Sequence, residues 1–204
     1  SEDDLKRNDM YRANAQRAKA QSRFADYHDY LLSLEMTAEI GDFSPLYLQR
    51  ITQLTNKSNQ FNLTTKRYTA EAVYNSDEYI RLYGKLYDKF GDNGVVAVTI
   101  GKTDSEDKGR LDIELWLMSC RVLKRDMELA MLDSLVEQAK KRGIREIYGH
   151  YYPTAKNKMV AGLYESFGFE KISQDEEGNT AWRLLVEGYE DKNTVIKVKE
   201  EHYA

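Results

Sequence analysis

The amino-acid sequence predicts a mixed α/β domain preceded by a helical arm. Two observations lead to this fold class. Runs of alternating or β-branched residues, typical of strands, take turns along the chain with amphipathic segments of helical period. The chain has 204 residues, 41% of them hydrophobic and 31% charged, which is enough to bury one core.

The first 34 residues are expected to form the helical arm, or linker. Ser1 precedes three acidic residues, as a capping hydroxyl does at a helix start. The stretch to residue 21 is rich in good helix formers but poor in apolar residues, so this helix should not be deeply buried. A second short helix is predicted over residues 24–34, where Phe24, Tyr27, Leu31 and Leu34 recur at helical spacing.

The compact domain is expected at residues 35–187, with a charged tail at 188–204 that could form a loose strand. A strand at 36–40 comes first. Ser44 and Pro45 then start a helix that turns Leu46, Leu48, Ile51 and Leu54 inward. Thr69 could cap another short helix that ends at Val73.

The remaining elements alternate between strands and helices. Strands are predicted at residues 79–90, 95–100 and 111–120, with a turn at 91–94. They are followed by a helix at 127–142, a strand at 144–152, a helix at 155–167 and a hairpin at 169–186. Gly143 and Gly168 stand where helices commonly end.

Composition excludes several classes of function. A net charge of −4, from 30 basic and 34 acidic residues, gives no general attraction to nucleic acid. No apolar run approaches the ~18 residues of a membrane span, so no membrane association is expected. The single Cys120 cannot form an internal disulfide, which favours a reducing, cytoplasmic setting. One Cys and three scattered His give no metal-ligand spacing, so no metal site is predicted.

The region from residue 157 to 169 carries a first resemblance. Asn157, the pair Leu163-Tyr164 and the pair Gly168-Phe169 are spaced as in the last helix of the GNAT acetyltransferase superfamily. The resemblance implies a GNAT acyl-CoA N-acyltransferase-like sheet with flanking helices. It also implies that Asn157 contacts the cofactor and that the Tyr164 hydroxyl protonates a leaving thiolate. A capping Asn and a core Tyr remain the alternatives.

Three separated segments carry a second resemblance, at residues 59–68, 119–123 and 152–157. In this order they resemble the FkbH-like family, over nearly the whole chain. The resemblance implies that a haloacid-dehalogenase (HAD) type phosphatase domain precedes the arm, and that an acyl carrier protein is the partner. It implies loading of a glyceryl unit onto the carrier, toward methoxymalonyl extender units for polyketides. The chain has no Asp-x-Asp-x-Thr motif, so phosphatase chemistry is not assigned to it.

The segment at residues 121–126 stands where GNAT enzymes hold the pyrophosphate of coenzyme A. The GNAT resemblance implies a loop that reads roughly Gln/Arg-x-x-Gly-x-Gly/Ala. Arg121 matches, but Lys124 and Asp126 replace the glycines. In one interpretation Arg121, Lys124 and Arg125 still bind an anion at the helix start. In the other, which we favour for acetyl-CoA, the side chains block the phosphate and Asp126 caps the helix. A carrier's phosphopantetheine arm could still enter, so either this arm or acetyl-CoA is possible and no cofactor is certain.

Cys120 and His150 are candidates for the chemistry. Cys120 follows a strand and precedes Arg121 and a helix start, a setting that favours a thiolate nucleophile. His150 ends the neighbouring strand and could act as a general base. A buried strand cysteine and a structural histidine are the alternatives.

Polar side chains at residues 59–64 and at Lys156 are candidates for substrate binding. Asn59, Gln60, Asn62 and Thr64 could bind a hydroxylated acyl group, or could satisfy an irregular backbone. Lys156 could bind a carboxylate or phosphate, or be solvated.

Three functions follow. The first is the acyltransferase half of an FkbH-like enzyme. The second is a catalytically silent GNAT-like module that docks the carrier protein. The third is an acetyl-CoA-dependent N-acetyltransferase, which the altered loop disfavours.

Overall fold

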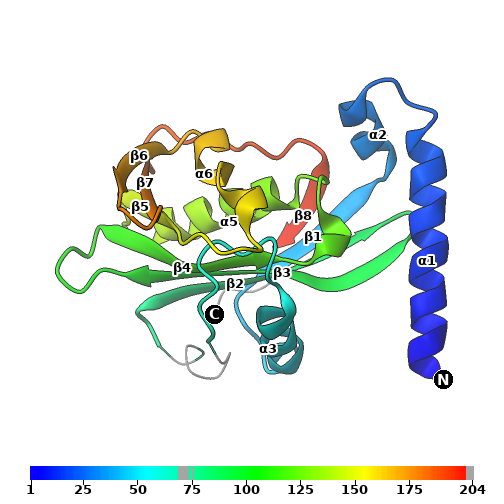
Figure 1. The fold of residues 1–204 in the computed structure, drawn as a ribbon, viewed down its shortest axis with the longest axis horizontal. Coiled ribbons are helices and arrows are strands. Elements are labelled where there is room, and N and C mark those ends of the chain that lie inside the picture. Colours follow the sequence, from blue (N-terminus) through cyan, green and yellow to red (C-terminus); the bar gives the residue numbers. More distant parts are fainter. Residues whose placement is uncertain (69–73, 75, 201–204) are drawn as a thin grey trace.

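The computed structural model describes residues 1–68, 74 and 76–200, and shows a single mixed sheet with helices on both faces (Figure 1). Eight strands lie in the order β6-β7-β5-β4-β3-β2-β1-β8. Neighbours are antiparallel except for the pairs β4–β5 and β1–β8, which are parallel. This confirms the mixed α/β fold class and the helical segment at the N-terminus. The short helix predicted over residues 69–73 lies outside the described residues.

The strands cover the predicted β segments closely. Their bounds are β1 (Met36–Gly41), β2 (Tyr79–Asp88), β3 (Gly91–Thr103), β4 (Arg110–Met118), β5 (Glu146–Tyr151), β6 (Glu170–Gln174), β7 (Thr180–Leu185) and β8 (Ile196–Glu200). The last strand, β8, comes from the charged tail, where a loose strand was considered. It pairs in parallel with β1 from Met36 to Ile40 and completes one edge of the sheet.

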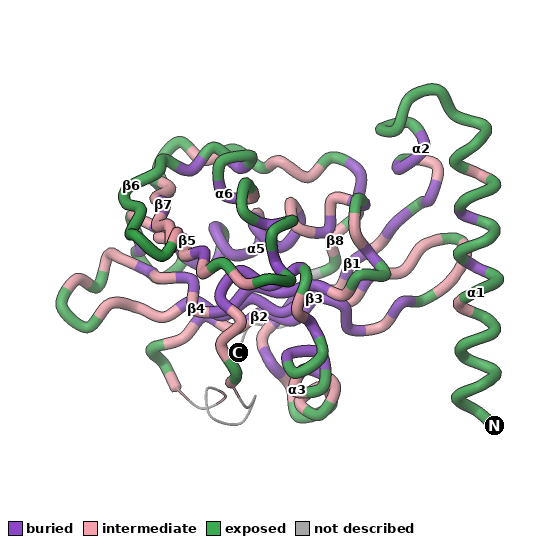
Figure 2. Tube along the Cα trace, in the orientation of Figure 1, coloured by how far each residue is buried: buried purple, intermediate pink, exposed green. Residues whose placement is uncertain are grey.

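The N-terminal arm consists of α1 (Glu2–Gln21) and α2 (Tyr27–Ser33). Ser1 and Asp4 form a capping box at the start of α1. Only Ala13 and Arg17 of α1 are buried, as the polar sequence predicts, and most of the helix is exposed in Figure 2. Arg17 donates two hydrogen bonds to Asp88, at 2.7 and 2.9 Å, and so fastens α1 to the end of β2.

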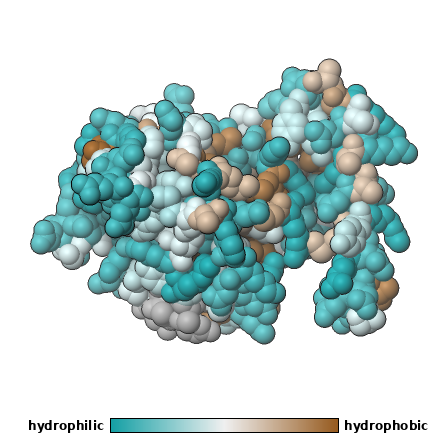
Figure 3. Space-filling model, viewed as in Figure 1, coloured by the Kyte–Doolittle hydropathy of each residue, from teal (hydrophilic) through white to brown (hydrophobic). Residues whose placement is uncertain are grey.

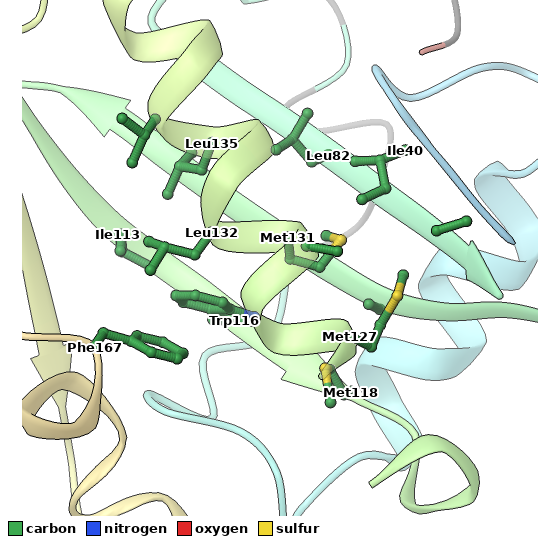
Figure 4. Close-up of a cluster of buried hydrophobic side chains, with 14 of the residues drawn as sticks. Ile40, Leu82, Ile113, Trp116, Met118, Met127, Met131, Leu132, Leu135 and Phe167 are labelled. Atoms are coloured by element: carbon green, nitrogen blue, oxygen red, sulfur yellow. The ribbon is translucent and has the colours of Figure 1, made fainter. Parts of the chain in front are cut away.

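The core lies between the sheet and α5 (Met127–Lys141), with α3 (Leu48–Lys57) on the opposite face. Figure 4 shows Met127, Met131 and Leu135 of α5 above the strands. In the same cluster Trp116 of β4 stacks on Phe167 with ring centroids 5.4 Å apart. Burial of these side chains is the main stabilising contribution.

Three differences from the predicted elements affect more than the ends of a helix or strand. The chain turns between β2 and β3 at Lys89–Phe90 instead of 91–94, because the Asp88 carboxylate accepts the amides of Phe90 and Gly91. The helix predicted from residue 44 begins at Leu48, after a turn.

The third difference from the prediction is the helix expected over residues 155–167. It is reduced to a 3₁₀ turn, η2 (Lys158–Val160), and a short α6 (Leu163–Ser166). Hydrogen bonds between the side chains of Asn157 and Thr154 and nearby backbone groups replace the helical pattern, and Gly162 interrupts the rest.

Candidate functional site

The region of interest is the gap where β4 and β5 diverge. The two parallel strands pair over only three positions, from Arg110 opposite Glu146 to Asp112 opposite Tyr148. Beyond this point each strand turns an edge of backbone N–H and C=O groups toward the gap. Such an edge can pair with another extended chain, including the amides of a pantetheine arm.

The chain itself fills the gap, with the buried residues 61–64. The amide of Leu63 donates to the carbonyl of Trp116 at 3.1 Å, and the amide of Met118 donates to the carbonyl of Phe61 at 3.0 Å. On the other side the amide of Tyr152 donates to the carbonyl of Leu63 at 2.9 Å. The segment therefore bridges the two diverging strands.

Asn157 locks this segment in place. The side chain is fully buried, and its Nδ2 donates to the carbonyls of Asn62, at 2.9 Å, and Tyr152, at 3.0 Å. Its Oδ1 accepts the amide of Thr154 at 2.7 Å. The amide group is thus committed to the protein's own backbone, in the place where the resemblance implied a cofactor contact.

The polar side chains predicted for substrate binding at residues 59–64 also make contacts within the protein. Asn62 donates to the carbonyl of Ser58 and accepts the amide of Thr65, and Thr64 donates to the carbonyl of Glu114. Asn59 accepts a hydrogen bond from Arg67. These contacts match the alternative in which polar side chains satisfy irregular backbone. Of the predicted substrate residues, Gln60 and Lys156 are exposed.

Tyr164 belongs to the core. Its side chain is 1% exposed, and its ring packs so closely over Gly149 that a Cβ there would lie 2.4 Å from it. The hydroxyl lies near the backbone of His150, but among the described residues it has no hydrogen bond of ordinary geometry. Burial raises the pKa of Tyr164 far above its usual value. This placement matches the core alternative and gives no route from the hydroxyl to solvent.

Cys120 and His150 lie in different surroundings. Cys120 is exposed at the start of the 3₁₀ turn η1 (Cys120–Val122), and its Sγ donates to Oε1 of Gln60 at 3.2 Å. The buried-strand alternative for Cys120 is therefore wrong. In the described part of the chain, no contact joins Cys120 to His150.

His150 forms a polar cluster with side chains of β4. Its Nε2 lies 2.7 Å from Oδ1 of Asp112, which also accepts two hydrogen bonds from Arg110, both at 2.9 Å. Burial opposes ionisation of Asp112, but the hydrogen bonds from His150 and Arg110 outweigh it and lower the Asp112 pKa. A cavity of about 250 Å³ opens beside the cluster, with the ion pair of Lys66 and Glu114 on its wall.

Sequence reasoning missed Asp112 and Glu114. A usable signal was present, because the two acids alternate with buried Leu111, Ile113 and Leu115 in β4 and therefore share the opposite face.

The loop at residues 121–126 keeps the backbone shape of a glycine loop. Lys124 and Asp126, at the two glycine positions, both have φ of 65°. Asp126 stands at the N-cap position of α5, as expected, but its side chain makes no capping hydrogen bond to the helix. Asp126 itself takes the left-handed conformation, unlike the extended backbone of an ordinary N-cap.

The N-terminal arm and the core take up the polar groups of this loop. The Tyr27 hydroxyl of α2 donates to the carbonyl of Lys124. Arg125 is 7% exposed, donates to the carbonyl of Arg121 at 2.8 Å and lies 3.6 Å from Asp88. Arg125 therefore faces an internal carboxylate. Arg121 and Lys124 remain exposed.

Coenzyme A, which the GNAT resemblance implies, does not fit the residues present. The edge of β4 is already paired with residues 61–64, and Asn157 is fully used. We therefore derive no step through coenzyme A.

Comparisons with known proteins identify the fold. No protein-family model and no curated protein matches the chain. Among solved structures, the ribosomal-protein-S18-alanine N-acetyltransferase of Escherichia coli aligns with a TM-score of 0.54 at 14% identity, over 78% of this chain and 99% of that one. The GNAT domain of PAT from S. lividans aligns with a TM-score of 0.55 at 14% identity, over 72% and 89%.

A third neighbour is a Salmonella typhimurium protein solved with its cofactor acetyl-CoA. It aligns with a TM-score of 0.54 at 14% identity, over 76% of this chain and 96% of that one. No helix in the described part of the chain is long and apolar enough to span a membrane, and the same residues hold no group of His, Cys, Asp and Glu arranged for a metal. At this identity the alignments establish architecture, and the chain has the GNAT acetyltransferase fold.

Proposed function

We propose that this chain is the GNAT-fold part of an FkbH-like protein, and that it docks an acyl carrier protein without using acetyl-CoA. The link to FkbH-like proteins rests on the sequence segments at 59–68, 119–123 and 152–157. In this proposal the arm at residues 1–34 follows a HAD-type phosphatase domain, and the carrier bears a glyceryl-type acyl unit. The unpaired thiol of Cys120 supports a reducing, cytoplasmic setting.

The main support for docking without acetyl-CoA is the occupied gap between β4 and β5. Residues 61–64 hydrogen-bond to both strands, and the buried Asn157 holds them there. Replacing them with an acyl-pantetheine would break these hydrogen bonds and expose buried Phe61 and Leu63. The GNAT fold then serves as a scaffold, and its surface is left for recognition of a partner.

A titration of this chain with carrier protein tests docking. The carrier is supplied in three forms: without phosphopantetheine, with the free arm, and with a glyceryl thioester on the arm. Saturable binding of all three forms with affinities within about threefold is expected, since surface docking contributes the free energy. Absence of binding to every form, up to the millimolar range, would overturn docking.

A second candidate function, thiol relay, is favoured by the exposure of Cys120. The Cys120 thiolate would attack the thioester carbonyl of the loaded arm, form an acyl-cysteine and release the arm's thiolate, which takes up the proton. No oxidant or other reactant is needed. Gln60 is placed to orient the thiol, because its Oε1 accepts the Sγ–H.

Mass spectrometry of the intact chain separates the two candidates. After mixing with glyceryl-loaded carrier, the relay predicts one acyl adduct on the wild-type chain and no adduct on the Cys120→Ala variant. Docking predicts no adduct and equal carrier binding by both proteins. Cys120→Ser is the matched control for shape, because it keeps a hydrogen-bond donor for Gln60.

A further inference from the structure

A second, larger cavity lies outside the β4–β5 gap, where α1 approaches α3. Its volume is about 880 Å³, and the surface is hollowed between the first half of α1 and the body of the domain (Figure 3). Its wall is formed by the first half of α1, the start of α3, the β2–β3 hairpin and Arg121.

Positive charge gathers in this cavity although the whole chain is acidic. Five cationic side chains line it, against the two carboxylates of Asp3 and Asp92. The cationic residues are Lys6, Arg7, Arg50, Lys85 and Arg121. Asp92 accepts the amide of Gly94 at 2.7 Å, which occupies part of its carboxylate. An excess of positive charge on the walls favours an anion inside.

The surroundings of the Arg50 side chain give the main evidence about this cavity. Its guanidinium is partly buried, and in the described part of the chain it has no hydrogen bond and no ion pair. Burial, and then the neighbouring charge of Arg121, lower the pKa of Arg50. Among the described residues, the side chain of Arg121 finds one weak acceptor, the Met10 sulfur at 3.5 Å. The guanidiniums of Arg50 and Arg121 thus line the same cavity and repel each other, an arrangement that a bound anion would stabilise.

We propose that this cavity binds a phosphate group, either as the free ion or as a small monoester, between Arg50 and Arg121. Phosphate fits because its oxygens accept paired hydrogen bonds from a guanidinium and its double charge matches two arginines. Lys85, held over the Tyr47 ring at 5.3 Å, adds a third cation. Apolar wall from Met10, Tyr11 and Val95 leaves room for the carbon part of an ester.

This site is independent of the proposed carrier docking. It shares Arg121 with the loop where coenzyme A was considered, but its other cations come from α1, α3 and β2. Neither Arg50 nor Lys85 was expected to bind anything from the sequence, since each lies in an ordinary amphipathic element.

Calorimetric titration of the full chain tests the proposal, with inorganic phosphate and phenyl phosphate as ligands at constant ionic strength set by chloride. Saturable 1:1 binding is expected. Arg50→Gln and Arg121→Gln should each weaken it by about tenfold or more, the loss of one charge-assisted contact. Arg23→Gln is the matched control, because Arg23 is exposed and does not line the cavity.

The ligands distinguish the source of the phosphate. Tighter binding of phenyl phosphate would identify an ester, and equal binding would identify the phosphate group alone. Absence of saturation by either ligand, or equal weakening by Arg23→Gln, would overturn the site.

A melting experiment without ligand separates a binding role from a structural one. Removing one of two like charges should leave the melting temperature of Arg50→Gln at or above that of the wild type. A clear decrease would show that Arg50 supports the fold, and would refute the proposal.

Discussion

Replacement of Asn157 by Ala tests the lock on residues 61–64. Asn157 is fully buried and its amide satisfies three backbone groups: the carbonyls of Asn62 and Tyr152 and the amide of Thr154. Alanine removes all three partners and leaves a small cavity. The gap segment would then keep its backbone hydrogen bonds to Trp116, Met118 and Tyr152 and the other side-chain hydrogen bonds of Asn62 and Thr64.

The expected loss of stability follows from these three groups. A buried backbone group without a partner costs about 1–3 kcal/mol, and water entering the new cavity would offset part of this. We therefore expect Asn157→Ala to lower the free energy of unfolding by about 3–5 kcal/mol. For a domain of this size that corresponds to a decrease in melting temperature of roughly 10 °C.

Urea unfolding followed by circular dichroism measures the change, with Asn59→Ala as control. Asn59 also carries an amide in this segment, but it is only partly buried and bonds an exposed Arg67, so its loss should cost less than about 1 kcal/mol. Amide exchange at Leu63 should also become faster in Asn157→Ala. A loss below about 1 kcal/mol for Asn157→Ala would refute the lock.

Three further predictions concern other side chains. Asp88→Ala should lower the free energy of unfolding in urea by about 3–5 kcal/mol, because it leaves the buried guanidiniums of Arg17 and Arg125 without their ion-pair partner. A loss no larger than that caused by replacing an exposed acidic residue would contradict this. Tyr164→Phe should leave the free energy of unfolding equal or higher by about 1 kcal/mol, since it removes a buried hydroxyl that has no hydrogen-bond partner in the described part of the chain. A clear loss in urea would contradict that. Asp112, with its lowered pKa, should stabilise the fold above pH ~4 and lose this contribution as pH falls further, so the stabilities of wild type and Asp112→Asn should converge as the pH is lowered below ~4. Curves that stay parallel over that range would show that ionised Asp112 is not stabilising.

The local pattern predicted most of the elements, for a physical reason. The β-branched run near Val95 and the alternation from Leu111 to Leu117 are strong because both segments are buried in the sheet. The stripe along α5 is equally clear, because one side of it packs on the core. Local pattern failed at the last helix, where Asn157 bonds to backbone that is distant in sequence.

The candidate site was harder to predict because the role of each side chain depends on hydrogen bonds between segments that are distant in sequence. Asn62 and Asn157 are 95 residues apart, and nothing in either local sequence shows that one side chain bonds the other's backbone. The exposure of Cys120 and the burial of Tyr164 also follow from tertiary packing. Motif resemblance drew attention to Asn157 and Tyr164, but it could not tell a ligand contact from a contact within the chain.

The occupied gap between β4 and β5 is the central claim, and residue-resolved amide exchange with and without millimolar acetyl-CoA tests it most directly. Binding of the ligand's phosphates near Arg50 would leave the gap amides unaffected. We expect slow exchange at Leu63, Met118 and Tyr152 that acetyl-CoA does not change. Fast exchange at these amides, or a change in their exchange on adding acetyl-CoA, would show that the gap is open to the cofactor and would contradict the account.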